Sequence, residues 1–368
     1  MIKVMSVFGT RPEAIKMAPL IKELEKSDRI KSIVCVTAQH RQMLDQVLEY
    51  FKIKPNYDLN IMKQGQTLSM ITTSVLNDLG SIIESEKPDI ILVHGDTTTS
   101  FAGALAAFYH QVLIGHVEAG LRTWNKYSPY PEEMNRQMVD SLADLYFAPT
   151  STSKENLLKE NKSEDKIYIT GNTAIDAMEY TVRENYQNQH LDWASDSKLI
   201  LLTAHRRENI GDSMRNIFRA VKRIVEDFKE VKVIYPIHLN PQVRKIASEI
   251  FQNNERIRLI EPLDVVDFHN FIKQSYFIMS DSGGVQEEAP HLGKPVLVLR
   301  DTTERPEGVE ANTLKLVGTK EEDIYLSAKE LLTNSQKYDE MAKAKNPYGD
   351  GTASKQIVKI IENYFKTK

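Results

Sequence analysis

The chain has 368 residues and nearly balanced charge, with 47 lysine and arginine residues against 51 aspartate and glutamate residues and a net charge of −4 at pH 7. A single hydrophobic core rarely grows beyond about 250–300 residues, so this length predicts two domains. The charge balance argues against a general nucleic-acid-binding protein, which needs a basic surface to displace the counterions of phosphates. It does not exclude a small phosphorylated ligand, because a few well-placed cations are enough to bind one.

The first residues and the single cysteine predict a cytoplasmic protein. Cys35 is the only cysteine and lies in an apolar run, which indicates a buried structural thiol rather than a disulfide or a thiolate metal site. The opening MIKVMSVFGTRPE has a short apolar part interrupted by charges, unlike a signal peptide. No stretch approaches the ~18–20 apolar residues of a membrane helix. We therefore expect neither a membrane nor a nucleic acid among the partners.

Short β-rich runs alternate along the chain with segments of helical periodicity. Several of the runs are continuously apolar, as expected of strands buried on both faces of a parallel sheet. The expected strands are residues 3–8, 32–37, 89–94, 112–117, 145–148, 167–170, 198–204, 231–236, 257–260, 276–280 and 295–299. The amphipathic segments that predict helices include residues 14–26, 68–86, 214–228 and 241–251. This alternation predicts an α/β fold of two doubly wound domains with right-handed crossovers.

A polar stretch places the expected domain boundary near Gly171. We predict a first domain over residues 1–170, a second over 171–351, and no secondary structure over 187–197. A last helix is expected over 354–366, after a turn-rich segment. Open α/β sheets bind ligands beyond the carboxyl ends of their strands, so a cleft between the two domains is the expected site.

Charged residues and glycines cluster where the predicted strands end. After the first strand, Gly9 allows a tight turn and Pro12 suits the first turn of a helix. The free N–H groups of that helix would face an anion together with Arg11 and Lys16. A solvated helix start is the alternative. No G-x-G-x-x-G fingerprint and no G-x-x-x-x-G-K-[ST] loop occurs, which argues against NAD and ATP.

Three carboxylates follow neighbouring elements of the first domain. Asp96 and Glu118 come directly after predicted strands, and Glu132 stands in the motif PEEMNR. Such a group suits acid–base chemistry, although Asp96 alone could be a helix cap. Glu133 could equally be a helix-start residue and stays unassigned.

In the second domain, His205 follows a strand and precedes two arginines, an arrangement that suits a phosphate. The segment 282–284, Ser-Gly-Gly, opens a predicted helix, where backbone N–H groups could approach a diphosphate; a tight turn with a serine cap is the alternative. No H-E-x-x-H, CxxC or D-x-D motif points to a metal. The residues alone thus predict a diphosphate ligand that faces three carboxylates and a histidine.

Eight motifs in order carry a resemblance to a known family: GTRPEAIK, HGDTTT, HVEAGLRT, SPYPEEMNR, TAHRREN, SDSGGVQEEAP, RDTTERPEG and NPYGDG. By these motifs, which run from Gly9 to about Gly351, the chain resembles the non-hydrolysing UDP-N-acetylglucosamine 2-epimerases. The resemblance implies a GT-B-like fold of two Rossmann-type domains with the ligand cleft between them and a last helix, about 352–368, packed back on the first. It also implies reversible epimerisation of UDP-GlcNAc to UDP-ManNAc for cell-surface polysaccharide, without a cofactor or metal, in a homodimer.

The same resemblance implies a set of site residues. Contacts to the UDP-sugar are expected from Arg11, Lys16, Asp96, Glu118, His205, Phe268, Ser282, Gly283, Gly284, Glu288 and Arg305. Roles in the chemistry are expected for Asp96, Glu118, Glu132 and His205. A regulatory site for a second, activating UDP-GlcNAc is matched by Gln39, Gln42, Glu132, Arg206 and His238. Gly65 stands where close relatives carry arginine, which predicts weaker activation, and a glutamine of some members is not reproduced in residues 261–264.

The implied reaction has a chemical difficulty that these residues fit. The proton on sugar carbon 2 has no adjacent carbonyl, so a carboxylate cannot simply remove it. If the bond from carbon 1 to UDP breaks first, that proton becomes acidic, and its loss gives a 2-acetamidoglucal; re-addition of UDP with a proton on the opposite face inverts carbon 2. The alternatives are a hydrolysing relative that releases UDP and ManNAc, a GT-B glycosyltransferase, and a UDP-sugar sensor without turnover. Retention of all the implied catalytic residues speaks against the sensor.

Overall fold

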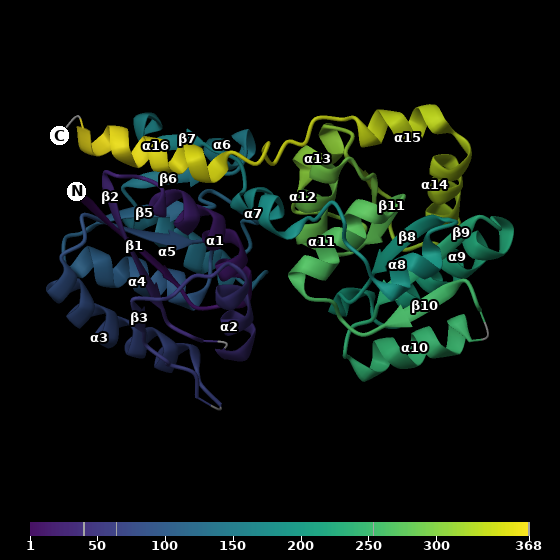
Figure 1. The fold of residues 1–368 in the computed structure, drawn as a ribbon, viewed down its shortest axis with the longest axis horizontal. Coiled ribbons are helices and arrows are strands. Elements are labelled where there is room, and N and C mark those ends of the chain that lie inside the picture. The colour runs from purple at the N-terminus through teal and green to yellow at the C-terminus, as the bar shows by residue number, and fades with distance from the viewer. Residues whose placement is uncertain (40, 64, 253, 367–368) are drawn as a thin grey trace. The chain divides into compact units, whose positions relative to one another are not determined.

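The chain divides between two units that each hold one sheet. In the computed structural model, which describes residues 1–39, 41–63, 65–252 and 254–366, unit 1 comprises Met1–Tyr180 with Tyr348–Lys368, and unit 2 comprises Thr181–Pro347 (Figure 1). The chain enters unit 2 after Tyr180, later than the Gly171 boundary expected from the sequence. Among the described residues, no helix is both long enough and apolar enough to cross a membrane.

Unit 1 is built on a seven-stranded sheet in which every neighbouring pair of strands runs parallel. The order along the sheet is β3-β2-β1-β4-β5-β6-β7. These strands are β1 (Ile2–Phe8), β2 (Ile30–Val36), β3 (Tyr57–Asp58), β4 (Ile90–His94), β5 (Leu113–Val117), β6 (Leu145–Ala148) and β7 (Ile167–Ile169). The predicted α/β class with a parallel sheet is confirmed.

Helices cover both faces of this sheet. One face is covered by α1 (Arg11–Glu25), α2 (Arg41–Tyr50) and α16 (Ala353–Lys366). The other is covered by α3 (Leu68–Glu86), α4 (Thr98–Tyr109) and α5 (Glu132–Leu142). In β1, Val4 and Phe8 pack on the first face and Met5 and Val7 on the second, as the alternation of side chains along a strand requires. The remaining segments are α6 (Ser151–Lys159), η1 (Glu164–Lys166) and α7 (Thr173–Thr181).

The last helix belongs to unit 1, where a carboxylate of α7 holds its start. Asp176 accepts hydrogen bonds from the backbone N–H groups of Ser354 at 2.7 Å and Ala353 at 3.3 Å. The N–H groups at a helix start have no partner within the helix, so Asp176 caps α16. Ile357 and Ile361 are fully buried in the cluster that includes α1, and α16 lies along unit 1 in Figure 1.

Unit 2 repeats the arrangement with six parallel strands in the order β10-β9-β8-β11-β12-β13. They are β8 (Lys198–Thr203), β9 (Val231–Pro236), β10 (Ile257–Ile260), β11 (Phe277–Ser280), β12 (Val296–Val298) and β13 (Leu314–Leu316). One face carries α9 (Asp212–Asp227), α10 (Pro241–Phe251), α14 (Glu321–Thr333) and α15 (Ser335–Ala342). The other carries α8 (Gln189–Ala194), α11 (Val265–Gln274), α12 (Gly283–Glu288) and η3 (Ala289–Leu292). Two short segments complete the unit, η2 (Arg207–Asn209) and α13 (Pro306–Glu310).

The expectation of no secondary structure over residues 187–197 is wrong, because α8 lies there. The Asn188 side chain accepts the backbone N–H of His190 at 2.9 Å and caps the helix, and Leu191 and Ala194 are buried. Six residues are too few for helical periodicity to show in a sequence. The strands β3 and β13 were also missed, because β3 has only two residues and β13, Leu-Lys-Leu, is not a continuous apolar run.

The strand order of each sheet reverses at one place. In unit 1 the direction of the strand order changes between β1 and β4, and in unit 2 it changes between β8 and β11. The crevice at such a reversal is where open α/β sheets bind ligands. Asp96 lies in the loop after β4, Arg11 begins the helix after β1, and His205 and Ser282 follow β8 and β11. The fold therefore places the predicted motifs of each unit at its own switch point.

Candidate active site

A buried carboxylate organises the turn that follows β1. Glu13 accepts hydrogen bonds from the backbone N–H groups of Thr10 at 2.8 Å and Gly9 at 3.1 Å, and Thr10 caps α1. The same carboxylate accepts the hydroxyl groups of Thr97 at 2.7 Å and Ser100 at 2.9 Å, at the start of α4. Burial raises the pKa of Glu13, although these hydrogen bonds oppose the rise. Glu13 thereby ties the loop after β1 to the loop after β4, on the two sides of the switch point.

Lys16 and Glu118 meet at this edge of the sheet. Lys16 lies on α1 beyond the partly exposed Arg11 and forms an ion pair with Glu118, the residue that follows β5. Asn172 donates to the same carboxylate at 2.9 Å, and Nε2 of His94 lies 3.7 Å from it. Burial lowers the pKa of His94 to about 3, so a neutral imidazole faces Glu118. The structure thus brings together two predicted site residues that are far apart in the sequence.

Glu118 occupies a strained backbone position. Its φ of +67° lies in the left-handed region, which residues other than glycine rarely adopt. The N–H groups of Glu118 and Ala119 both donate to the carbonyl oxygen of Phe147, each at 3.1 Å. Gly120 follows with a φ of +86°, and a side chain there would meet the carbonyl oxygen of Ser153 at 2.2 Å. Surrounding contacts therefore impose this conformation, and such strain is concentrated at functional sites.

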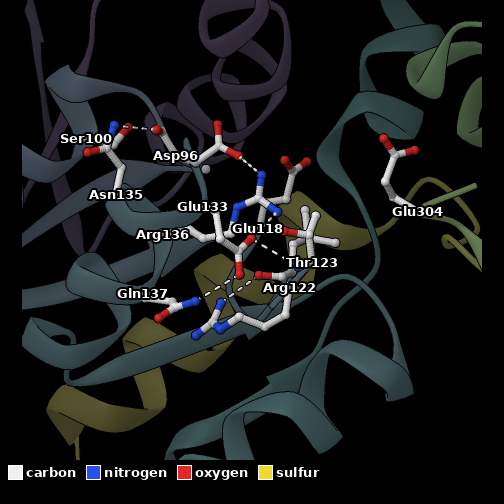
Figure 2. A network of polar contacts seen from close by, with 12 residues as sticks. Asp96, Ser100, Glu118, Arg122, Thr123, Glu133, Asn135, Arg136, Gln137 and Glu304 are labelled. Carbon is white, nitrogen blue, oxygen red and sulfur yellow. Dashed lines mark hydrogen bonds and ion pairs between the residues drawn. The ribbon is translucent and has the colours of Figure 1, made fainter. Parts of the chain in front are cut away.

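Asp96 lies beside Arg136 of α5 (Figure 2). Nη2 of Arg136 donates to Oδ2 of Asp96 at 2.6 Å, and Nδ2 of Asn135 donates to the Asp96 carbonyl oxygen at 2.9 Å. Burial raises the pKa of Asp96, the Arg136 cation opposes the rise, and the nearby Glu118 charge adds to it. The negative charges of Asp96 and Glu118 therefore repel each other, as do the carboxylates of acid–base sites.

The two adjacent glutamates at the start of α5 differ in environment. Glu133 is fully buried, and its carboxylate accepts the backbone N–H groups of Thr123 at 3.0 Å and Trp124 at 3.1 Å (Figure 2). Burial alone would raise the pKa of Glu133, but these hydrogen bonds and the Arg136 cation hold it below its ordinary value. Glu132 is partly exposed, and its carboxylate makes no hydrogen bond or ion pair within the described part of the chain. Glu133 thus holds the loop before α5, whereas Glu132 has no structural task there.

In unit 2, the buried carboxylate of Asp281 holds the loop that carries His205. It accepts the backbone N–H groups of His205 and Arg206, each at 2.9 Å, and Nδ2 of Asn209 at 3.1 Å. The His205 ring stacks on His238 with centroids 5.5 Å apart, and its Nδ1 lies 3.4 Å from Asp281. Burial lowers the pKa of His205, although the Asp281 charge opposes the shift. The His205 imidazole is therefore held in place and favours its neutral form.

A pocket of about 290 Å³ opens beside His205. Apolar surface with a few polar groups lines it, as in other small-molecule sites. The lining residues are Thr203, Ala204, His205, Pro236, His238, Pro262, Leu263, Phe268, Ser282, Gly284, Val285 and Glu288. They include His205, Phe268, Ser282, Gly284 and Glu288 of the predicted contacts, and Pro262 and Leu263 come from the segment that lacks the family's glutamine. Unit 2 thus gathers most of the contacts expected for the nucleotide.

Gly283 has a task of its own at the start of α12. A Cβ atom there would meet Nη1 of Arg305 at 2.6 Å and Cζ at 2.8 Å. Arg305 is oriented by Glu287, because its Nε donates to Oε1 of Glu287 at 2.6 Å. At Gly284, by contrast, a Cβ atom would make only an ordinary contact with Glu288 at 3.6 Å. Gly283 therefore makes room for the Arg305 guanidinium against the first residue of α12.

The residues predicted for a regulatory site divide between the units. Gln39 and Gln42 lie in unit 1 around the start of α2, and Gln39 accepts a threonine hydroxyl of α4 at 3.2 Å. Arg206 and His238 lie in unit 2, in the loops after β8 and β9. Gly65 has a φ of +74°, a conformation that residues with a side chain rarely adopt.

Metal ligation has no support within the described ranges, where no group of three or more histidine, cysteine, aspartate and glutamate side chains could hold an ion. Cys35 is buried, and burial raises its pKa to about 12, which confirms the predicted structural thiol.

Four residues of the site were missed by sequence reasoning: Glu13, Arg136, Asn172 and Asp281. Arg136, Asn172 and Asp281 bind the predicted residues Asp96, Glu118 and His205, and Glu13 holds the backbone just before Arg11. Glu13 had a local signal, since Thr-x-x-Glu before an apolar run predicts a capping box. The other three act over long sequence separations, for which a single sequence offers no pattern.

The close approach at Gly283 predicts a specific defect in nucleotide binding. Gly283→Ala should push the Arg305 guanidinium away, because a methyl group and Nη1 cannot both occupy this space. We expect UDP to bind about tenfold more weakly, because the displaced guanidinium would lose one charge-assisted hydrogen bond to UDP. Isothermal titration measures this affinity. Arg305→Gln and the double variant Gly283→Ala/Arg305→Gln are the controls; a double variant much weaker than Arg305→Gln would contradict the assignment.

Comparison with known proteins places the chain among epimerases. The family model described as UDP-N-acetylglucosamine 2-epimerase matches residues 22–362. The chain is 65% identical to the UDP-N-acetylglucosamine 2-epimerase of Bacillus subtilis over 360 residues, which cover 98% of this chain and 95% of that protein.

Solved structures agree over the whole length. The chain is similar to a Neisseria meningitidis UDP-GlcNAc 2-epimerase bound to UDP-GlcNAc, with a TM-score of 0.89, 50% identity, and coverage of 98% of this chain and 100% of that one. It is also similar to S. aureus MnaA in complex with UDP, with a TM-score of 0.91, 57% identity, and coverage of 100% and 97%. A Rickettsia africae glycosyltransferase, 13% identical with a TM-score of 0.65, shares the fold alone, which is therefore GT-B-like. The chain belongs to the UDP-N-acetylglucosamine 2-epimerase family.

Proposed function

We propose that this protein reversibly inverts carbon 2 of UDP-N-acetylglucosamine to give UDP-N-acetylmannosamine. The observation that carries the proposal is the pair of carboxylates at the unit 1 switch point. Asp96 is bound by Arg136 and Glu118 by Lys16, and the Glu118 charge adds to the rise that burial causes in the pKa of Asp96. Membership of the epimerase family supports the choice of substrate.

The first step of the proposed reaction breaks the bond between carbon 1 and the UDP oxygen. UDP leaves with the electron pair, so negative charge grows on the diphosphate and positive charge on the sugar. Cations and N–H groups stabilise such a leaving group if they are already in place. In unit 2, Arg305, the start of α12 and the imidazole of His205 are groups of this kind, fixed by Glu287 and Asp281.

In the second step, the proton of carbon 2 passes to a carboxylate and the carbon 1–carbon 2 double bond forms. Asp96 suits this transfer, because burial raises its pKa and lets it hold a proton closer to neutral pH than an exposed aspartate does. Return requires a proton donor on the opposite face of carbon 2 and attack of the UDP oxygen on carbon 1. Glu118 and Glu132 are the remaining carboxylates that could donate the proton on that face.

Two other readings of the same site are an enzyme that hydrolyses the intermediate and a sensor without turnover. Hydrolysis would add water to the sugar and release free ManNAc. A sensor has no need for the strained backbone of Glu118, which costs free energy to maintain. The geometry therefore favours turnover, and the products distinguish the two enzymes.

The remaining parts of the proposal rest on family resemblance. We propose a cytoplasmic homodimer that supplies precursor for cell-surface polysaccharide and needs no cofactor. A second UDP-GlcNAc would bind at Gln39, Gln42, Glu132, Arg206 and His238 as an activator. The glycine at position 65 deprives that site of one cation, so activation should be weaker than in relatives that carry arginine there.

Incubation with UDP-GlcNAc in heavy water tests the function directly. The proposal predicts UDP-ManNAc with deuterium at carbon 2, because the abstracted proton exchanges with solvent before return. Proton NMR of the sugar follows both the exchange and the inversion. Free ManNAc would instead identify the hydrolysing enzyme, and an unchanged spectrum with tight UDP-GlcNAc binding would identify the sensor.

Asp96→Asn tests the role of this carboxylate. The amide preserves size but cannot accept a proton, so we expect UDP affinity to stay within about twofold and kcat to fall by about 10²-fold or more. Asp78→Asn, at an exposed position of α3, is the matched control. Wild-type turnover in Asp96→Asn would remove Asp96 from the mechanism.

The pH dependence of Arg136→Gln tests the environment of Asp96. Arg136 favours the ionised form of Asp96, so its removal should raise the Asp96 pKa further. If Asp96 must be ionised to accept the proton, the acidic limb of kcat/KM should move to higher pH. Lys159→Gln, exposed on α6, should leave the profile unchanged. An acidic limb at the same pH in Arg136→Gln would show that Asp96 does not control it.

A further inference from the structure

His116, the first residue of the motif HVEAGLRT, is fully buried in β5 and makes hydrogen bonds at both ring nitrogens. Its Nε2 lies 2.7 Å from the carbonyl oxygen of Gly95, and its Nδ1 lies 2.6 Å from Oδ1 of Asp140 on α5. None of the proposed chemical steps uses this ring. It is nevertheless bonded to the residue that immediately precedes Asp96.

The partners determine which way the protons point. A carbonyl oxygen can only accept, so Nε2 donates to Gly95. The Asp140 carboxylate also accepts the backbone N–H of Gly120 at 3.2 Å and Nη2 of Arg122 at 2.7 Å, so it is surrounded by donors. Burial alone would raise the pKa of Asp140, but the charges of His116 and Arg122 and their hydrogen bonds hold it below its ordinary value. The two partners therefore hold both nitrogens of the His116 ring, and the ring links the Gly95 carbonyl oxygen to the Asp140 carboxylate.

A buried arginine also binds the Asp140 carboxylate. The Arg122 side chain is fully buried, and besides Asp140 it binds Glu160, with Nε 2.7 Å from Oε1. A buried carboxylate is costly unless it is paired and hydrogen-bonded, so Arg122 and the other donors around Asp140 account for its burial.

The two ends of the pair reach different loops. His116 holds the carbonyl oxygen of Gly95, just before Asp96, and Asp140 holds the N–H of Gly120, just after the Glu118–Ala119 segment. Both loops contain backbone in the left-handed region, with φ of +62° at Gly95, +67° at Glu118 and +86° at Gly120. Glycine adopts such a conformation freely, but that of Glu118 persists only where surrounding contacts impose it.

We infer that His116 and Asp140 form a buried hydrogen-bonded pair that positions Asp96 and Glu118 relative to each other for proton transfer. The inference rests on the proposed function, because it assigns the pair a role in that reaction. His116 and Asp140 are positioning residues, since they contact the backbone of the two loops and not the reacting atoms. A displacement of about 1 Å at a reacting group can cost about 10²-fold in rate.

His116→Asn tests one arm of the pair. The shorter amide can still donate to Asp140 from the position of Nδ1, but it cannot reach the Gly95 carbonyl. We expect kcat to fall about 10²-fold, while KM for UDP-GlcNAc and UDP affinity change by less than about threefold. Wild-type kcat in a folded His116→Asn protein would overturn the inference.

Asp140→Asn and Asp140→Ala test the contact of Asp140 with Gly120. These two variants also test the positioning role if His116→Asn does not fold. The amide that Asp140→Asn introduces can donate to Nδ1 of His116 while its oxygen accepts from Gly120, and Nε2 keeps its proton for Gly95. We therefore expect Asp140→Asn to keep kcat within about tenfold and Asp140→Ala to lose about 10²-fold. Equal kcat for the two variants would contradict a positioning role.

Glu160→Gln is the matched control, because Glu160 binds the Arg122 side chain of the same cluster and not the backbone of Gly95 or Gly120. It should lower the melting temperature but keep kcat. A loss of kcat equal to that of His116→Asn would show that the cluster serves stability alone. The heavy-water experiment on the wild-type protein tests the proposed function by itself. The positioning role is tested separately, by the ratio of variant to wild-type kcat.

Discussion

Buried carboxylates that accept backbone N–H groups are the interaction on which the site depends. An ionised carboxylate without such donors would be very costly to bury, so each one forces nearby backbone to turn its N–H groups inward. Glu13 does this for the loop after β1, Glu133 for the loop before α5, Asp140 for Gly120, and Asp281 for the loop after β8. Loops are usually the most mobile parts of an α/β fold, and these carboxylates hold them in one conformation.

The proposed chemistry is divided between residues of the two units. Unit 2 has the pocket with His205, Phe268 and Glu288, together with Arg305, which suit a nucleotide and its diphosphate. Unit 1 has Asp96 and Glu118, whose mutual electrostatic influence suits proton transfer. A fixed geometry matters more for the second task, because proton transfer requires donor and acceptor within hydrogen-bond reach. Unit 1 accordingly contains the denser network of buried charges, with Glu13, Glu133 and Asp140 all fully or almost fully buried.

The elements that could be predicted from the sequence are longer than those that could not, and the residue pairs that could not be predicted are far apart in the chain. The long apolar strands and the amphipathic helices α3 and α10 were predicted within a few residues, since their own periodicity reveals them. The two-residue β3 and the six-residue α8 carry no such signal. Asp96 and Glu118 could be named because they stand directly after strands. Arg136 could not be assigned to Asp96, since only the packing of α5 beside β4 and β5 brings the two together.

The sequence by itself determined the α/β class, the positions of most strands and the family, because these depend on local periodicity and on motifs that are contiguous in the chain. Only the tertiary structure decided which residues pair at the switch points. Lys16 meets Glu118, Arg305 lies against Gly283, and His116 links the loops of Asp96 and Glu118. The physical reason is that charge pairing and burial depend on distance in space, which the order of residues along the chain does not contain.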